Sequence, residues 1–182
     1  VSQLVDSASG IHTRHSPYYI RTVRTDVKDP LCTLLIDSGV PSEPDITNPS
    51  NVMVFSFPMR SPKYSLTRKD LSAISQLELH SIYSKFWAEH KVSQTISVKE
   101  EEWLTVGSYV FDNFDDISGV SFLPYSDYIY KQAPYTECTK KEFDSLSKSL
   151  PTIDWKNLLK YETLDSTSGS QELACTAGGC EL

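Results

Sequence analysis

Helix-type and strand-type patterns alternate along this chain, and this alternation limits the folds that it can form. Short apolar runs at 52–57, 94–98 and 119–124 predict strands, with helical spacing of apolar residues between them. A proline-rich loop at 40–51 precedes the first strand, which we expect to end at Pro58. Isolated strands between helices are typical of an α/β sheet. We therefore predict an α/β fold.

Start signals place the helices of the first half. Residues 29–39 begin with a capping Asp-Pro pair and end at a glycine, which predicts one helix. The pattern from Thr67 to Asp70 resembles a capping box and predicts that the longest helix runs over 67–91. For residues 16–23 a short helix and a strand both remain open.

Two further helices are predicted in the second half. A complete capping box at Thr139–Glu142 begins one helix, which ends at Pro151 and is followed by a last helical turn or two over 154–161. The other covers 100–114. Its buried face is expected to hold Trp103, Val106, Val110 and Phe114.

A polar stretch at 163–170 lacks the pattern of a core, and two cysteines, Cys175 and Cys180, follow it almost at the end of the chain. The small residues between them allow the tight turn that a disulfide between them requires. A dithiol on a mobile chain end can exchange disulfides by thiolate attack. We predict that 162–182 is a flexible redox tail. A disordered terminus with incidental cysteines and half of a metal site are the alternatives.

Composition excludes several classes of protein. The chain has 182 residues and a net charge of −7, from 17 basic and 24 acidic residues, which argues against nucleic acid as its main partner. No apolar run has the length of a membrane span, and we expect no signal peptide and no membrane partner. Four cysteines in a chain of this length do not make a secreted disulfide scaffold. We therefore expect a cytoplasmic protein.

The remaining cysteines and two histidines are weaker candidates for chemistry. Cys32 lies in an apolar helical pattern and Cys138 precedes a helix cap, so we interpret both as structural. His12 and His15 have a spacing that metal ligands can use, but no nearby carboxylate or cysteine completes a set. No metal site is predicted.

Several segments together resemble, in the same order, segments of adenosylcobalamin-dependent ribonucleotide reductases. No single motif decides the resemblance, but the order of the motifs is specific. Within the family, the monomeric, triphosphate-type and phage-type enzymes are the most similar. The segments are 9–24, 52–62, 71–78, 95–103, 119–124, 132–135 and 169–181.

The resemblance implies a ten-stranded α/β barrel, of which residues 1–161 form the C-terminal part. The sequence begins at Val1 with no start signal or helix cap, and we expect a fragment or the C-terminal part of a split or processed protein. In the family, the radical cysteine and an internal dithiol lie upstream, so neither can be placed here. We expect the chain alone to be inactive.

The resemblance also implies roles for four residues and several partners. In the family, a thiyl radical abstracts a ribose hydrogen, a dithiol becomes a disulfide, and C-terminal cysteines reduce it before thioredoxin or a similar protein recharges them. Cys175 and Cys180 match those tail cysteines. Arg21 and Arg24 are candidates to neutralise a substrate triphosphate, with surface or packing roles as the alternative. Adenosylcobalamin, a ribonucleotide substrate and the remaining N-terminal part of the reductase are implied as well.

Two other functions remain open. The chain could be a non-enzymatic thiol redox or interaction module whose tail binds a partner. It could also belong to the iron-dependent class of reductases, which likewise uses C-terminal cysteine pairs. The patterns at Tyr18–Arg21 and Ser121–Pro124 favour the adenosylcobalamin class.

Overall fold

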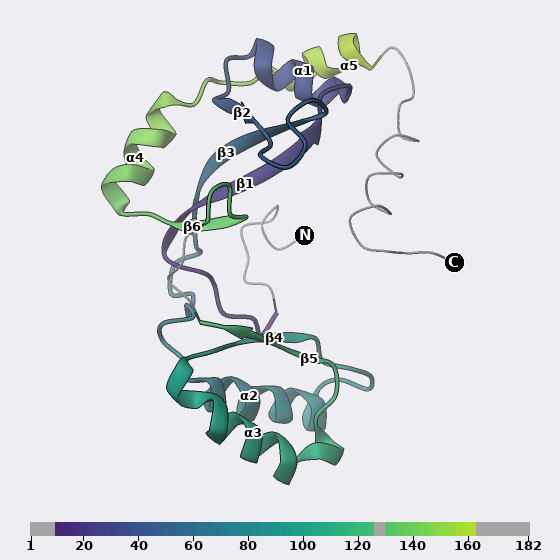
Figure 1. The fold of residues 1–182 in the computed structure, drawn as a ribbon, viewed down its shortest axis with the longest axis vertical. Helices are drawn as coiled ribbons and strands as arrows, with labels where there is room; N and C mark the ends of the chain where they lie inside the picture. The colour runs from purple at the N-terminus through teal and green to yellow at the C-terminus, as the bar shows by residue number, and fades with distance from the viewer. Residues whose placement is uncertain (1–9, 126–129, 163–182) are drawn as a thin grey trace. The chain divides into compact units, whose positions relative to one another are not determined.

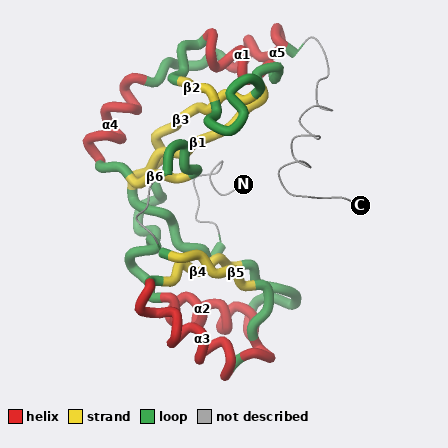
Figure 2. Tube along the Cα trace, in the orientation of Figure 1, coloured by secondary structure: helices red, strands yellow, loops and turns green. Residues whose placement is uncertain are grey.

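The structure is a computed structural model that describes residues 10–125 and 130–162 (Figures 1 and 2). The predicted tail cysteines, Cys175 and Cys180, lie outside the described residues. The predicted α/β class is confirmed, because helices and strands alternate along the chain. The described strands number six and form two separate sheets, neither of which is closed.

The chain divides into two compact units, which are described here one at a time. Unit 1 consists of Val1–Tyr19 and Arg60–Ile129. Unit 2 consists of Ile20–Met59 and Tyr130–Leu182.

The sheet of unit 2 has four strands in the order β2-β3-β1-β6. β2 pairs antiparallel with β3, and Glu43 lies opposite Val54. Ser61 N donates to Pro17 O beyond one end of the β1–β3 pair, and Val27 N donates to Asn51 O beyond the other, so these strands are also antiparallel. The strands are β1 (Tyr18–Asp26), β2 (Ser42–Pro44), β3 (Val52–Arg60) and β6 (Tyr135–Glu137).

Two short helices pack together beside this sheet. α1 and α5 lie side by side in Figure 1, and the Tyr161 hydroxyl donates to Asp37 Oδ2 at 2.8 Å. The core beneath α1 contains Cys32, Leu35, Val40 and Phe55. The helical elements of unit 2 are α1 (Pro30–Asp37), α4 (Lys140–Ser149), η3 (Trp155–Asn157) and α5 (Leu158–Tyr161).

Unit 1 is a parallel strand pair covered on one face by two helices. β4 and β5 pair in parallel, with Ile96 opposite Phe122, and α2 and α3 lie on the same face of them (Figure 1). The core between these layers contains Ala73, Leu77, Ile96, Val98 and Val106. The elements are α2 (Ala73–Phe86), β4 (Gln94–Val98), η1 (Glu100–Glu102), α3 (Trp103–Asp112), η2 (Phe114–Asp116) and β5 (Val120–Pro124).

Local signals predicted several elements correctly. Asp29 caps α1 and accepts a hydrogen bond from Leu31 N, and both arms of the capping box between Thr139 and Glu142 are formed. The strands predicted at 94–98 and 119–124 are β4 and β5. The helical turn expected over 154–161 is present as η3 and α5. The open choice at 16–23 is settled in favour of a strand, β1.

The predicted strand end at Pro58 is wrong, because β3 continues to Arg60. Proline lacks an N–H and is tolerated where a strand needs no donor. The N–H of Ser61 donates to Pro17 O, next to β1. Backbone N–H groups alternate between the two edges of a strand, so an N–H at position 58 would point to the edge of β3 away from β1. β2 pairs with β3 only from Met53 to Phe55, so it provides no acceptor there.

The predicted start of the longest helix is also wrong. α2 begins at Ala73, where the Ser72 side chain accepts from Ser75 N, and it ends at Phe86. The Asp70 carboxylate does bond back to the N–H and hydroxyl of Thr67. This bonding closes an isolated turn, because such side-chain contacts also form outside helices.

The helix predicted at 100–114 is shorter than expected and only part of its predicted buried face is correct. Val106 is buried, and Trp103 and Val110 pack against the core of unit 1. Phe114 lies beyond the end of α3 and is 73% exposed. Its predicted place on the buried face is therefore wrong.

Candidate functional site

Arg21 extends from β1 toward β6 in unit 2. Its Nη1 donates to Pro134 O at 3.5 Å, and its Cζ lies 4.5 Å from the centroid of the Tyr135 ring. A guanidinium at this distance from an aromatic ring gains a favourable cation–π interaction. Arg21 thus helps to hold β6 beside β1.

Arg24 forms an ion pair with a buried carboxylate. Its Nε lies 2.6 Å from Asp45 Oδ2, and the Asp45 side chain is 2% exposed. The other Asp45 oxygen accepts from the N–H and hydroxyl of Thr47 and from Asn48 N. These bonds, chiefly from Thr47 and then from Arg24, hold the pKa of Asp45 well below its usual range.

Gln132 links the loop before β6 to the loop around β2. Its Nε2 donates to Glu43 Oε1 and Pro44 O, both at 2.9 Å, and its Oε1 accepts from Ile46 N at 3.1 Å. Arg24 Nη2 also donates to Gln132 O at 3.1 Å. Both predicted arginines therefore contact the same loop and strand. A role for Arg21 or Arg24 in phosphate binding stays a prediction.

The two described thiols are poorly suited to exchange chemistry. Cys32 is fully buried, and burial, then the carboxylates of Asp29 and Asp26, raises its pKa. Cys138 is half-buried, and its pKa is raised by burial first and then by two neighbouring glutamates. A raised pKa leaves little reactive thiolate. The burial predicted for Cys32 is thus confirmed, whereas Cys138 is only half-buried.

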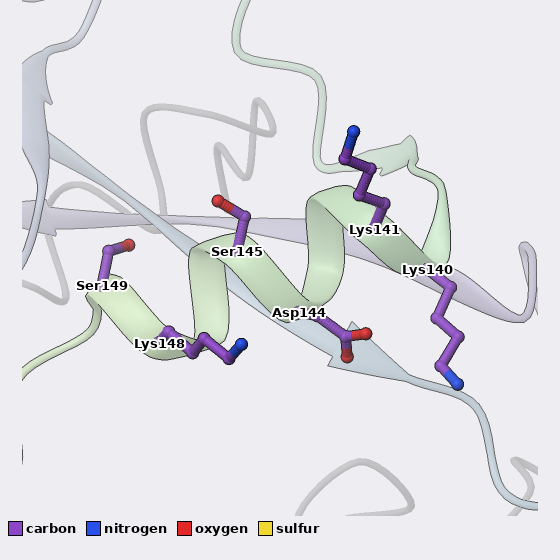
Figure 3. Close-up of a pocket in the computed structure, with 6 residues that line it drawn as sticks. All are labelled: Lys140, Lys141, Asp144, Ser145, Lys148 and Ser149. Atoms are coloured by element: carbon purple, nitrogen blue, oxygen red, sulfur yellow. The ribbon is translucent and has the colours of Figure 1, made fainter.

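A hollow of about 820 Å³ lies along one face of α4 (Figure 3). All of its lining residues belong to this one helix, and their side chains project outward from it in several directions (Figure 3). A binding pocket needs walls from more than one element to surround a ligand. We interpret this surface as a solvated helix face. The lining residues are Lys140, Lys141, Asp144, Ser145, Lys148 and Ser149.

No metal centre is formed by the described residues, since none of their His, Cys, Asp and Glu side chains gather into a group of three or more. His15 Nδ1 lies 3.2 Å from Ser16 Oγ, so this ring is placed by a neighbouring hydroxyl. Over the described ranges, no helix has the length and apolar character to cross a membrane.

Sequence reasoning missed Arg14, which is 7% exposed in unit 1. Its Nε and Nη2 are buried and have no hydrogen-bond partner among the described residues. No sequence signal marks this arginine, because its burial depends on contacts with residues far along the chain. Arg14 pairs in a β-bridge with Thr67.

Several curated proteins are similar in sequence to this chain. A probable adenosylcobalamin-dependent ribonucleoside-triphosphate reductase of Dictyostelium discoideum is 33% identical over 165 residues, which cover 87% of this chain. The adenosylcobalamin-dependent ribonucleoside-triphosphate reductase of Euglena gracilis is 30% identical over 79% of this chain. That of Levilactobacillus brevis is 25% identical over 100% of this chain. No family model matches the chain.

The chain is a relative of adenosylcobalamin-dependent ribonucleotide reductases. The predicted resemblance is thus confirmed. The chain spans only 21%, 20% and 25% of the reductases of D. discoideum, E. gracilis and L. brevis. The crystal structure of a B12-dependent (class II) ribonucleotide reductase shares the fold, with a TM-score of 0.75 and 22% identity over 89% of this chain and 23% of that chain.

Proposed function

We propose that this chain is the C-terminal part of an adenosylcobalamin-dependent ribonucleoside-triphosphate reductase, which makes deoxyribonucleotides for DNA replication. The observation that carries the proposal is the 33% identity to the D. discoideum reductase over 87% of this chain. The alternative of a non-enzymatic redox or interaction module has no comparable support. All relatives named above carry the adenosylcobalamin description, which also disfavours the iron-dependent class.

Residues 1–161 would form part of the ten-stranded barrel of the complete reductase. The parallel β4–α3–β5 unit supports this, because parallel strands with helices on one face are the repeating unit of α/β barrels. A two-stranded parallel sheet has two unpaired edges, and an edge favours pairing with further strands. We propose that strands of the remaining part of the reductase occupy these edges.

Residues 162–182 would act as a redox tail that carries Cys175 and Cys180. One tail thiolate attacks the disulfide left in the active site after ribose reduction and forms a mixed disulfide. The second tail thiolate then attacks the tail sulfur of this bond, so the active site regains two thiols and the tail holds the disulfide. A thioredoxin-like protein supplies the two electrons that reduce the tail again.

The proposed substrate is a ribonucleoside triphosphate, and we place the reaction in the cytoplasm. Adenosylcobalamin, named for the relatives, supplies radical chemistry when bound.

The tail proposal is tested by replacing Cys175 in the complete reductase. Cys175→Ser should reduce thioredoxin-driven turnover to background, whereas a small dithiol that reaches the active site directly should still support turnover. Cys138→Ser is the matched control and should keep both activities, because this thiol is half-buried with a raised pKa. Unchanged thioredoxin-driven turnover in Cys175→Ser would show that the tail is not the shuttle.

A further inference from the structure

We propose that one side of α2 is a docking surface for a helix from the remaining part of the reductase. This surface, the α2 flank, consists of Leu79, Ile82, Tyr83 and Phe86. The identity of the partner rests on the proposed function, whereas the surface is a feature of unit 1 alone.

α2 is apolar on two of its sides. The side that packs on the core of unit 1 carries Ala73 and Leu77, both of which are buried. The α2 flank is a second apolar stripe, because its residues recur at the spacing i, i+3, i+4, i+7, which places side chains on one side of a helix. Within it, Tyr83 is 37%, Ile82 is 54% and Phe86 is 74% exposed. A contiguous exposed apolar stripe of this kind usually marks a contact with another protein segment.

The α2 flank faces away from α3. Ser81 Oγ lies 3.5 Å from the hydroxyl of Tyr109, so Ser81 marks the side of α2 that faces α3. Leu79 and Tyr83 each lie two residues from Ser81, and at 3.6 residues per turn two residues correspond to about 200°. Both therefore lie on the opposite side of α2. The flank is thus left for an element other than α3 to cover.

The same side of α2 lies toward the unpaired edge of β4. α2 contacts β4 and α3, and α3 connects β4 to β5. A crossover helix packs over the two strands that it joins. The side of α2 away from α3 therefore lies toward the edge of β4 that pairs with no strand among the described residues. A parallel sheet that continues beyond this edge adds a strand and another helix in the layer of α2.

The remaining part of the reductase suits this position better than a second copy of the chain does. The chain spans only 21% of the D. discoideum reductase and 20% of that of E. gracilis, so most of a complete reductase lies outside it. A two-fold-related copy that paired at this edge, with its helices on the same face, would run its β4 antiparallel to this one. We therefore assign the α2 flank to an amphipathic helix of the remaining part, packed with its ridges in the grooves of α2.

Calorimetric titration of this chain with the remaining part of the reductase tests the surface without turnover. Phe86→Ser removes the most exposed side chain of the α2 flank and should raise the dissociation constant about tenfold or more, because large apolar side chains dominate such interfaces. Glu78→Ser is the matched control, an exposed position of the same helix outside the flank, and should change the constant by less than about twofold. Equal constants for wild type and Phe86→Ser, or an equal loss in both variants, would overturn the proposal.

Photocrosslinking identifies the segment that covers the α2 flank. Phe86 is replaced by photoreactive p-benzoylphenylalanine, the complex is irradiated, and the crosslinked peptides are identified by mass spectrometry. We expect crosslinks to a segment of the remaining part with apolar residues at helical spacing. Crosslinks between two copies of this chain would show that the assigned partner is wrong. Crosslinks no more frequent than those from the same photoreactive residue at position 78 would show that the flank is not covered.

A thermal melt of the isolated chain separates docking from a structural role of Phe86. The ring is 74% exposed, so Phe86→Ser should melt within about 2 °C of wild type. A much lower melting temperature would show that the ring already packs within this chain, and the proposal would be wrong.

The docking surface and the proposed function fail in different ways. If the remaining part does not bind the wild-type chain, both are wrong. If it binds wild type and Phe86→Ser equally well, and both chains support formation of deoxyribonucleotides, the reductase function stands and only the docking surface is wrong.

Discussion

Unit 2 and unit 1 treat their buried polar groups differently. In unit 2, the buried Asp45 receives hydrogen bonds from Arg24, Thr47 and Asn48. In unit 1, Gln76 Oε1, His80 Nδ1 and both side-chain polar atoms of Gln94 are buried without a partner among the described residues. Polar groups buried in folded proteins are usually hydrogen-bonded. The buried carboxylate of unit 2 therefore has hydrogen-bond partners within its own unit, whereas several buried polar atoms of unit 1 have none among the described residues.

The exposed apolar side chains of unit 1 lead to the same conclusion. Large exposed apolar surfaces usually mark contacts with another protein segment. Unit 1 presents several large side chains that are at least 73% exposed, and the chain spans about a fifth of the D. discoideum relative. We infer that unit 1 is completed by the remaining part of the reductase. These side chains include Phe86, Trp87, Leu104, Phe111 and Phe114.

The largest effect is expected from breaking the network of unit 2. Asp45→Ala removes the acceptors of Arg24 Nε, Thr47 and Asn48 and should lower the free energy of unfolding by about 3 kcal/mol. Asp144→Ala, an exposed carboxylate on α4, should change it by less than about 0.5 kcal/mol. Urea unfolding followed by tryptophan fluorescence measures both. Equal effects of the two substitutions would show that the network contributes little.

A matched pair of substitutions should change the free energy of unfolding differently in the two units. Gln94→Met removes unpartnered buried polar atoms from unit 1 and should leave stability unchanged or raise it by about 1 kcal/mol. Gln132→Met removes three hydrogen bonds from unit 2 and should lower stability by about 1 kcal/mol. Urea midpoints measure both changes. Destabilisation by Gln94→Met would mean that this side chain has a partner, and the contrast between the units would fail.

The smallest expected effect is the pH dependence of the stability of unit 1. Burial lowers the pKa of His80, so the unfolded chain binds its proton more readily than the folded chain. The stability of unit 1 should therefore fall as the pH decreases below about 6.5. The contribution of Asp45 to unit 2 should persist there and be lost only in strong acid, because its pKa is lowered far below its usual range.

Urea unfolding at neutral and mildly acidic pH measures this difference. Trp103 reports on unit 1, where it packs against the core, and Trp155 lies in unit 2. His80→Leu should remove the pH dependence of unit 1, whereas His90→Gln should keep it. A pH dependence that survives in His80→Leu would assign it to another group.

Features that depend only on neighbouring residues, such as helix caps, could be predicted from the sequence. The caps at Asp29 and Thr139 involve neighbouring residues, and both are formed as expected. The turn at Thr67 used the same local chemistry but gave no helix. In the structure this residue also forms a β-bridge with Arg14, a contact that no local pattern reveals.

The candidate site depended more on contacts between distant residues. The candidate Arg24 was found by resemblance, but its ion pair with Asp45 joins residues 21 positions apart. Strand β6 has only three residues and shows no sequence pattern, so the partners of Arg21 in Pro134 and Tyr135 could not be predicted. Burial of Arg14 without a partner also becomes visible only in the folded chain.

Formation of deoxyribonucleotides is the most direct test of the account. The remaining part of the reductase, with adenosylcobalamin, a ribonucleoside triphosphate and thioredoxin, is assayed with and without this chain. We predict that deoxyribonucleotide forms only when the chain is present. Formation at the same rate without the chain would show that it is not a working part of the reductase.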